Sequence, residues 1–413
     1  MKRFLSMLLL LPLVLSVAAC GTEPAGTDES LANSSGSIAG SMTEDSSSVT
    51  DSQTQNTSPA TDSQAQNTSP ATDSQMQNTS SSTDTEGSTG TSTTTEEEVW
   101  EPTHVVDNLF LAGDQYNQDV LIYNLDKLEP GDDLDDAVVW SHHVGISHIA
   151  GLKYREDTVF GDVILVAAGA TKGKAQMISY PEGKVLWSTD QAGNNPHCIE
   201  ILPSGNIVVA SSTGGTMRLF KTAALLENDT KTAATYTDTA LYSAHGVLYD
   251  PKYQVLWGLG NNTLEAYEIG GSGAKEMLVR NDDMIFQLPT VVQGGHAIAA
   301  DLVDPDGLFV SVNEGAFRFN KETLTFEKTY EGYTKVNRKT VKGLAHNQNG
   351  NFCLAVPNGG KGTAWEKMGY GGWCTDTLTF CFYKTKNMFY AQQYTSSKGS
   401  AFYKVIAFNG TYQ

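Results

Sequence analysis

Three histidines and one lysine recur at nearly regular intervals along this chain. The four residues are His197, His245, His296 and Lys342. Neutral imidazoles that meet at one point can hold a divalent transition metal, whereas lysine ammonium groups favour an anion such as a carboxylate or a sulfate. Histidine paired with lysine or tyrosine can also act as general base and acid in abstracting a proton next to a carboxylate, which is lyase chemistry. The plain alternative is that each histidine is a structural hydrogen-bonding group.

Each of these residues opens a repeated unit. In the clearest copy, residues 196–210, an alternating strand is followed by a turn with Pro203 and Gly205 and then by an apolar strand, which predicts a β-hairpin. Similar stretches begin at the other three residues, and the steps between the four openings are 48, 51 and 46 residues. A looser copy lies near His148 and Lys153. A period of this length is typical of propeller blades or of solenoids.

The rest of residues 99–413 reads as short strands between turns, without a long amphipathic helix. The first unit lacks an inner strand, and the final apolar stretch, residues 401–408, can supply it. That pairing would close the array into a ring and protect its edges. We therefore predict an all-β domain, a six-bladed β-propeller closed by its C-terminal strand. A seventh blade is possible if residues 101–107 or 359–372 contain further strands.

The inner strands of propeller blades all start on one face beside the central channel, so the residues that open them are expected to converge. The predicted catalytic residues are His197, His245, His296 and Lys342. The same three histidines are the candidate metal ligands, and a divalent transition metal is the only cofactor that the sequence suggests. Further candidate ligand-binding residues near the channel are Asp114, Gln115, His148, Lys153, Asn195, Trp373 and Lys404.

Residues 1–19 have the anatomy of a secretory signal, with a basic start and a short apolar core. The residues before Cys20 resemble the bacterial lipobox, which implies cleavage before Cys20 and lipidation of its thiol. Residues 20–98 lack lysine and arginine and contain three copies of an eleven-residue unit that start at Thr50, Thr61 and Thr72. This composition predicts a disordered tether. We expect a protein lipid-anchored to the outer side of the bacterial cell membrane.

Charge bears on the kind of partner that this part of the chain can bind, and cysteine content bears on whether disulfides are expected. Residues 99–413 hold 34 acidic and 25 basic residues, a mildly acidic balance that argues against nucleic-acid binding. We expect a monomer. Four cysteines lie in this part of the chain, and we expect mostly free, buried thiols, although no pairing follows from the sequence. They are Cys198, Cys353, Cys374 and Cys381.

Several motifs resemble known propeller families. The run from His197 through residues 202–206 (Leu-Pro-Ser-Gly-Asn) looks like the histidine-containing blade motif of arylsulfate sulfotransferases. The ring of histidines is similar to that of oligogalacturonate and virginiamycin-B lyases, which implies a metal near the channel. A wider pattern, including residues 113–115, 195–197, 244–246, 256–260 and 295–296, resembles an uncharacterised family of bacterial secreted propellers. That last resemblance implies no established activity.

The sequence thus predicts a surface-anchored lipoprotein whose His- and Lys-lined channel binds or processes an extracellular carbohydrate or another anionic ligand. If the domain is an enzyme, the resemblances imply polysaccharide lyase-like or sulfotransferase-like chemistry. The alternative is a propeller that binds glycans without turnover, or one whose rim docks another protein.

Overall fold

A computed structural model describes residues 106–412, except 229–234, 290–293, 328–334 and 386–387. The predicted signal segment, Cys20 and the repeat-containing tether lie outside the described residues. None of the described helices is long and apolar enough to cross a bilayer.

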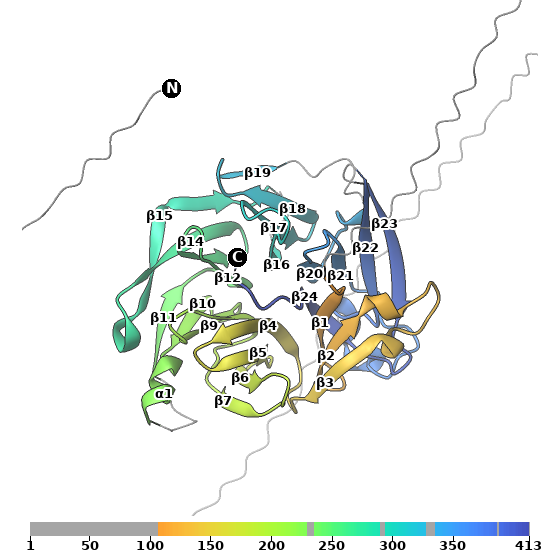
Figure 1. Cartoon of the computed structure of the whole chain (residues 1–413), viewed down its shortest axis with the longest axis horizontal. Helices are drawn as coiled ribbons and strands as arrows, with labels where there is room; N and C mark the ends of the chain where they lie inside the picture. Colours follow the sequence, from red (N-terminus) through yellow and green to blue (C-terminus); the bar gives the residue numbers. More distant parts are fainter. Residues whose placement is uncertain (1–105, 229–234, 290–293, 328–334, 386–387, 413) are drawn as a thin grey trace, which may run out of the picture. The chain divides into compact units, whose positions relative to one another are not determined.

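Six four-stranded antiparallel sheets surround a central channel (Figure 1), which confirms the predicted six-bladed propeller. The first three blades, from the channel outward, are β24 (Phe402–Ala407), β1 (Leu109–Asp114), β2 (Asp119–Asn124) and β3 (Val138–His143); β4 (Ile149–Thr158), β5 (Gly161–Ala168), β6 (Lys174–Ser179) and β7 (Val185–Thr189); and β8 (Pro196–Ile201), β9 (Ile207–Ser211), β10 (Thr216–Phe220) and β11 (Tyr236–Ala240).

The other three blades repeat this arrangement. They are β12 (Gly246–Asp250), β13 (Val255–Leu259), β14 (Thr263–Gly270) and β15 (Met277–Gln287); β16 (Gly295–Ala300), β17 (Gly307–Val312), β18 (Gly315–Asn320) and β19 (Thr325–Glu327); and β20 (Gly343–His346), β21 (Phe352–Ala355), β22 (Thr377–Thr385) and β23 (Met388–Thr395). The described helices are single turns: α1 (Leu225–Asn228), η1 (Leu125–Lys127), η2 (Leu134–Ala137), η3 (Thr222–Ala224), η4 (Gly273–Lys275), η6 (Glu366–Met368) and η7 (Tyr370–Gly372). The insertion at residues 359–372 therefore contains η6 and η7, not the strands of a seventh blade.

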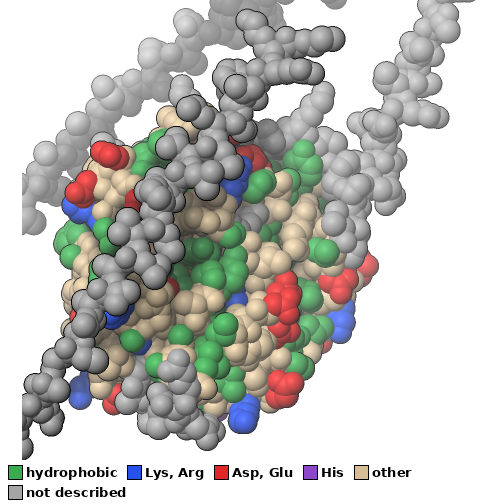
Figure 2. All heavy atoms as spheres, turned by 60° about the vertical axis from the view of Figure 1, so that its left-hand side comes forward, with side chains coloured by type: hydrophobic (Ala, Val, Ile, Leu, Met, Phe, Trp, Pro, Cys, Tyr) green, Lys and Arg blue, Asp and Glu red, His purple; other side chains and the backbone are tan. Residues whose placement is uncertain are grey.

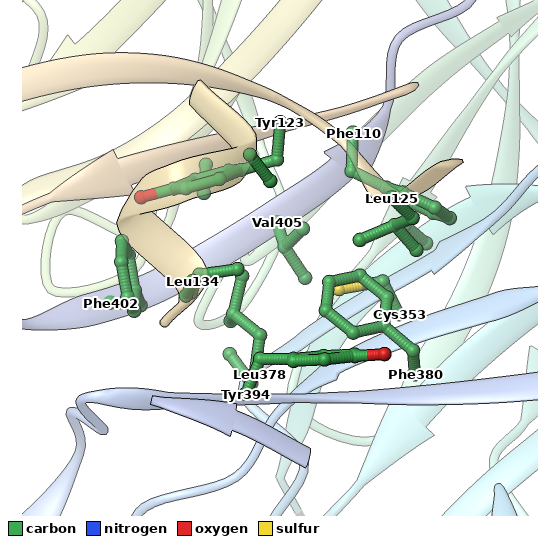
Figure 3. Close-up of a cluster of buried hydrophobic side chains, with 14 of the residues drawn as sticks. Phe110, Tyr123, Leu125, Leu134, Cys353, Leu378, Phe380, Tyr394, Phe402 and Val405 are labelled. Atoms are coloured by element: carbon green, nitrogen blue, oxygen red, sulfur yellow. The ribbon is translucent and has the colours of Figure 1, made fainter. Parts of the chain in front are cut away.

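The hydrophobic core lies between neighbouring blades. Inner strands such as β9 are buried along their whole length because adjacent sheets cover both of their faces. Figure 3 shows the cluster between blade 1 and blade 6, where the rings of Phe110 and Phe380 lie 5.5 Å apart. Phe402 and Val405 of the C-terminal strand belong to the same cluster and are almost completely buried. The last strand of the chain thus packs into the core together with the first.

The ring closes through hydrogen bonds between the two ends of the folded part. Strand β24 pairs antiparallel with β1, with Phe110 opposite Ala407 and Asp114 opposite Phe402. This pairing confirms the predicted closure by the C-terminal strand and leaves the first blade without an exposed inner edge.

Residues 408–412, the C-terminal tail, cover one end of the channel (Figure 1). Glu156 N donates to Gly410 O (3.2 Å), and Arg155 Nη1 donates to Thr411 O (3.0 Å). The rings of Phe408 and Tyr154 stack with centroids 4.0 Å apart. The tail is therefore held against the end of β4, and its Asn409 and Thr411 line a cavity of about 50 Å³ at this end of the channel.

The outer surface carries mixed charge where blade 4 faces solvent. Figure 2 shows acidic and basic side chains scattered over this side of the propeller. Strand β15 also exposes about half of Met277 and of Val279. Single exposed apolar side chains are common on the surfaces of folded proteins.

Candidate functional site

Four of the residues predicted to converge meet at the end of the channel opposite the tail. His197 is the second residue of β8, His245 precedes β12, His296 is the second residue of β16, and Lys342 precedes β20. The rings of His197 and His245 are stacked with centroids 4.2 Å apart, and those of His245 and His296 meet edge to face at 5.5 Å. Lys342 Nζ lies 2.8 Å from His296 Nε2.

The C-terminal strand adds two more side chains to this group. Lys404 is buried, and its ammonium group donates hydrogen bonds to the carbonyl oxygens of His296 and of Lys342, the latter at 2.7 Å. Tyr403 Oη lies 3.2 Å from His197 Nδ1. We call these six residues the mouth cluster: His197, His245, His296, Lys342, Tyr403 and Lys404.

Burial shifts the protonation of the whole mouth cluster towards neutral forms. Desolvation lowers the pKa of His245 to about 4 and that of His296 to about 3, and it lowers the pKa of His197 well below its ordinary value. The same effect lowers the pKa of Lys342 to about 8 and that of Lys404 to about 7. Near pH 7 the imidazoles are therefore neutral, and the positive charge of the cluster is carried mainly by Lys342, whereas Lys404 is close to the midpoint of its titration.

The two lysines have no acidic counterpart. Within the described part of the chain, neither Lys342 nor Lys404 forms an ion pair with a carboxylate. Buried cations are ordinarily paired, because an unpaired buried charge costs several kcal/mol. The lowered pKa values of Lys342 and Lys404 are the expected response to this lack of a counter-charge.

The geometry does not fit the predicted metal site. Lone pairs of an imidazole lie in its ring plane, so the nearly parallel rings of His197 and His245 cannot both point at one ion. His245 Nδ1 donates to Ser243 O (2.7 Å) and His296 Nε2 contacts Asn313 Oδ1 (2.7 Å), so each of these rings keeps one nitrogen outside these two bonds. Among the residues that the structure describes, no group of three His, Cys, Asp or Glu side chains is placed to hold a metal ion.

Space below the mouth is limited. A cavity of about 20 Å³ lies against His197, His245 and Lys404, which is room for about one water molecule. Beside the cavity, the buried His296 Nδ1 has no hydrogen-bond partner among the described residues. This cavity has room for a small group and not for a sugar ring.

The remaining candidate residues make internal contacts. Lys153 lies further along the channel, with Nζ 3.5 Å from Glu200 Oε2. Asp114 accepts from the backbone of Ala401 (2.9 Å), and Gln115 Oε1 accepts from Trp373 Nε1 (3.0 Å).

His148 and Asn195 are held in the same way. The His148 ring packs edge to face on Tyr370, and Asn195 Nδ2 donates to Ser212 Oγ (3.0 Å). The structure therefore places these residues outside the mouth cluster, and their role in ligand binding stays a prediction.

Three residues that contact the histidines of the mouth cluster were not identified from the sequence. Ser243 and Asn313 lie in turns and act on the histidines through single hydrogen bonds, for which the sequence holds no signal. Tyr403 had one available signal, since it precedes the predicted Lys404 in the strand that closes the ring.

All four predicted free cysteines are unpaired, and three of them are buried.

The fold and the mouth cluster together define a six-bladed β-propeller with a cationic channel mouth. The sequence pattern of a family of unknown function, DUF6528, matches residues 157–344. This match and the fold confirm the expected resemblance to an uncharacterised propeller family. No curated protein matches the chain.

Solved structures with a similar fold include a protein of unknown function from Bacteroides caccae, at 16% identity and a TM-score of 0.47, with 73% of this chain and 98% of that chain covered. A provisional 6-phosphogluconolactonase from Bacteroides fragilis has 12% identity and a TM-score of 0.47, with 74% and 99% covered. A functionally unknown protein from Desulfotomaculum acetoxidans has 11% identity and a TM-score of 0.43, with 70% and 100% covered.

Proposed function

We propose that the mouth cluster binds the carboxylate or sulfate group of an extracellular carbohydrate or a similar anionic ligand. In this proposal the propeller belongs to a lipoprotein that is anchored through Cys20 to the outer side of the bacterial cell membrane. The observation that carries the binding proposal is a pair of lysines, the partly buried Lys342 and the buried Lys404, for which no carboxylate partner is found among the described residues. A bound anion would supply the missing charge and favour the protonated form of both amines.

The hydrogen bonding of His296 supports an open position for this anion. Its Nε2 lies within hydrogen-bond distance of both Asn313 Oδ1 and Lys342 Nζ. A ring nitrogen carries either a proton or a lone pair, so it serves only one of these neighbours. When it donates to Asn313, the Lys342 ammonium group has no acceptor there and is available to a ligand.

Lys342→Met is expected to weaken anion binding at least tenfold, because the variant removes a charged donor from a poorly solvated site. Binding of oligogalacturonate and of a sulfated oligosaccharide to the full-length chain can be measured by calorimetry at pH 7. Lys184→Met is the matched control, since Lys184 is exposed in the turn between β6 and β7. Failure of the parent to bind either probe, or unchanged binding by Lys342→Met, would refute the proposal. Unsaturated products from oligogalacturonate would show that the same mouth also carries out lyase-type processing.

Anion affinity is expected to fall as the pH rises above about 7, where Lys404 loses its proton, and more steeply above about 8, where Lys342 does so as well. The pKa of Lys342 in the free protein is lowered to about 8, so above that pH binding must be accompanied by uptake of a proton. Linkage then weakens the affinity by up to about tenfold per pH unit. The measurement is a series of dissociation constants between pH 6.5 and 9.5. Lys342→Arg retains its charge throughout this range, so its affinity should change less, whereas equal slopes for parent and variant would contradict the assignment of the titrating group.

A further inference from the structure

A second cavity, larger than the one at the mouth, lies between blade 1 and blade 6. Its volume is about 420 Å³. Ordinary small-molecule sites have volumes of about 300–1,000 Å³. The cavity lies beside the ends of β2 and β22, next to the turn between β20 and β21, and shares no residue with the mouth cluster. We call it the interblade groove, and its walls include Asp126, Glu129, Asn349, Phe382, Tyr390 and Gln392.

One wall of the interblade groove is aromatic. Phe382 of β22 and Tyr390 of β23 occupy opposite positions of the hairpin, and their rings stack with centroids 4.9 Å apart and an interplanar angle of 19°. Tyr390 keeps 49% of its surface exposed, while Tyr394 in the same strand is buried. The Phe382 ring holds the Tyr390 ring in a fixed orientation, so an open aromatic surface is presented to the groove at little cost in side-chain entropy.

The other wall is polar and carries negative charge. Asp126 and Glu129 come from the connection after β2, and both are exposed. The Asp126 carboxylate is held in place because it accepts from Asn108 Nδ2 (2.7 Å) and Asn108 N (3.0 Å). Asn349 and Gln392 add amide groups, and none of the described side chains that line the groove, which exclude those of residues 384–388, is a lysine, an arginine or a histidine.

This combination matches the chemistry of a neutral sugar. A pyranose ring has an apolar C–H face that packs against an aromatic ring, and hydroxyl groups around its edge that donate to carboxylates and exchange hydrogen bonds with amides. The carboxylates of Asp126 and Glu129 in the polar wall disfavour an acidic sugar, which is the type that the mouth cluster would take. We propose that the interblade groove is a binding site for a neutral saccharide, with one sugar ring stacked on Tyr390 and its hydroxyl groups directed at Asp126 and Glu129.

The test uses the full-length chain and a panel of neutral oligosaccharides, namely the hexamers of cellulose, xylan, mannan, amylose and chitin, with binding measured by calorimetry. We expect at least one of them to bind, with affinity reduced tenfold or more in Tyr390→Ala and largely retained in Tyr390→Phe. Tyr242→Ala is the matched control, because Tyr242 is 75% exposed and lies outside the groove.

Absence of binding by every member of the panel, or equal binding by parent and Tyr390→Ala, would overturn the proposal. The exposure of Tyr390 means that its replacement should not unfold the domain, and an unchanged melting temperature checks this point. Lys342→Met should bind the neutral sugar as the parent does, so failure of the anion site and failure of the interblade groove can be told apart.

Discussion

Replacing Glu200 with alanine is expected to destabilise the propeller by about 3–5 kcal/mol, because the change leaves buried cations without their counter-charge. Glu200 is completely buried and accepts two hydrogen bonds from Arg155, at 3.0 Å and 2.7 Å. Lys153 Nζ lies 3.5 Å from the same carboxylate, and the backbone of Tyr249 donates to it at 3.4 Å. The carboxylate therefore joins three blades, and the free energy of unfolding in urea is the quantity to measure.

Asp238→Ala is the matched control for this prediction. Asp238 also accepts two hydrogen bonds from an arginine, Arg218, but its side chain is 38% exposed. Exposed ion pairs contribute about 0–1 kcal/mol, so this variant should remain close to the parent. Equal losses in Glu200→Ala and Asp238→Ala would show that burial of the Arg155–Glu200 pair does not matter.

Ending the chain at Ser400 is expected to abolish cooperative folding. This truncation removes β24, so the inner edge of β1 loses its partner and the core of blade 1 loses the buried side chains of Phe402 and Val405. Tyr403 and Lys404 of the mouth cluster disappear as well. Soluble yield, near-ultraviolet circular dichroism and resistance to protease report the result.

A second truncation, after Ala407, keeps β24 and removes only the C-terminal tail. It should remain folded, although with a lower melting temperature because the contacts of Phe408 and of residues 410–411 are lost. A folded chain ending at Ser400 would contradict the view that ring closure is required for stability.

Much of this fold could be predicted because the blades repeat a local pattern. The hairpin at residues 196–210 follows directly from its strand alternation and from the turn at Gly205, whose φ of 89° suits glycine. The repeat period then indicated blades, and the unpaired apolar stretch at the C-terminus indicated closure. Each of these steps depends only on pattern and on the need to cover strand edges.

The site was less predictable, since its chemistry depends on ring orientation. Convergence of the histidines follows from their equivalent places at strand starts. The directions of the imidazole lone pairs, on which a metal site depends, are set by the stacking of His197 on His245 and by the bond from His245 Nδ1 to Ser243 O, and neither is encoded in residue spacing.

The positions of the exposed aromatic side chains could not be predicted from the sequence either. The sequence offered Trp373 as a candidate ligand-binding residue, but the nearby Trp365 is fully buried and Tyr370 nearly so. Tyr390, which is exposed in the interblade groove, lies in a strand whose sequence looks like any other outer strand. Only the packing of blade 6 beside blade 1 distinguishes it.

Pairing of β1 with β24 also sets an order of events during synthesis. The ribosome releases β1 before any of the other described strands and β24 after all of them, so the ring stays open until translation of the domain is almost complete. Long-range pairing of this kind is slow to form. For a polypeptide that is exported as proposed here, the delay is useful, because a chain that has not yet closed its ring can still pass through a narrow translocation pore in extended form. Folding of the domain would then be delayed until β24 has been translocated to the outer side of the membrane.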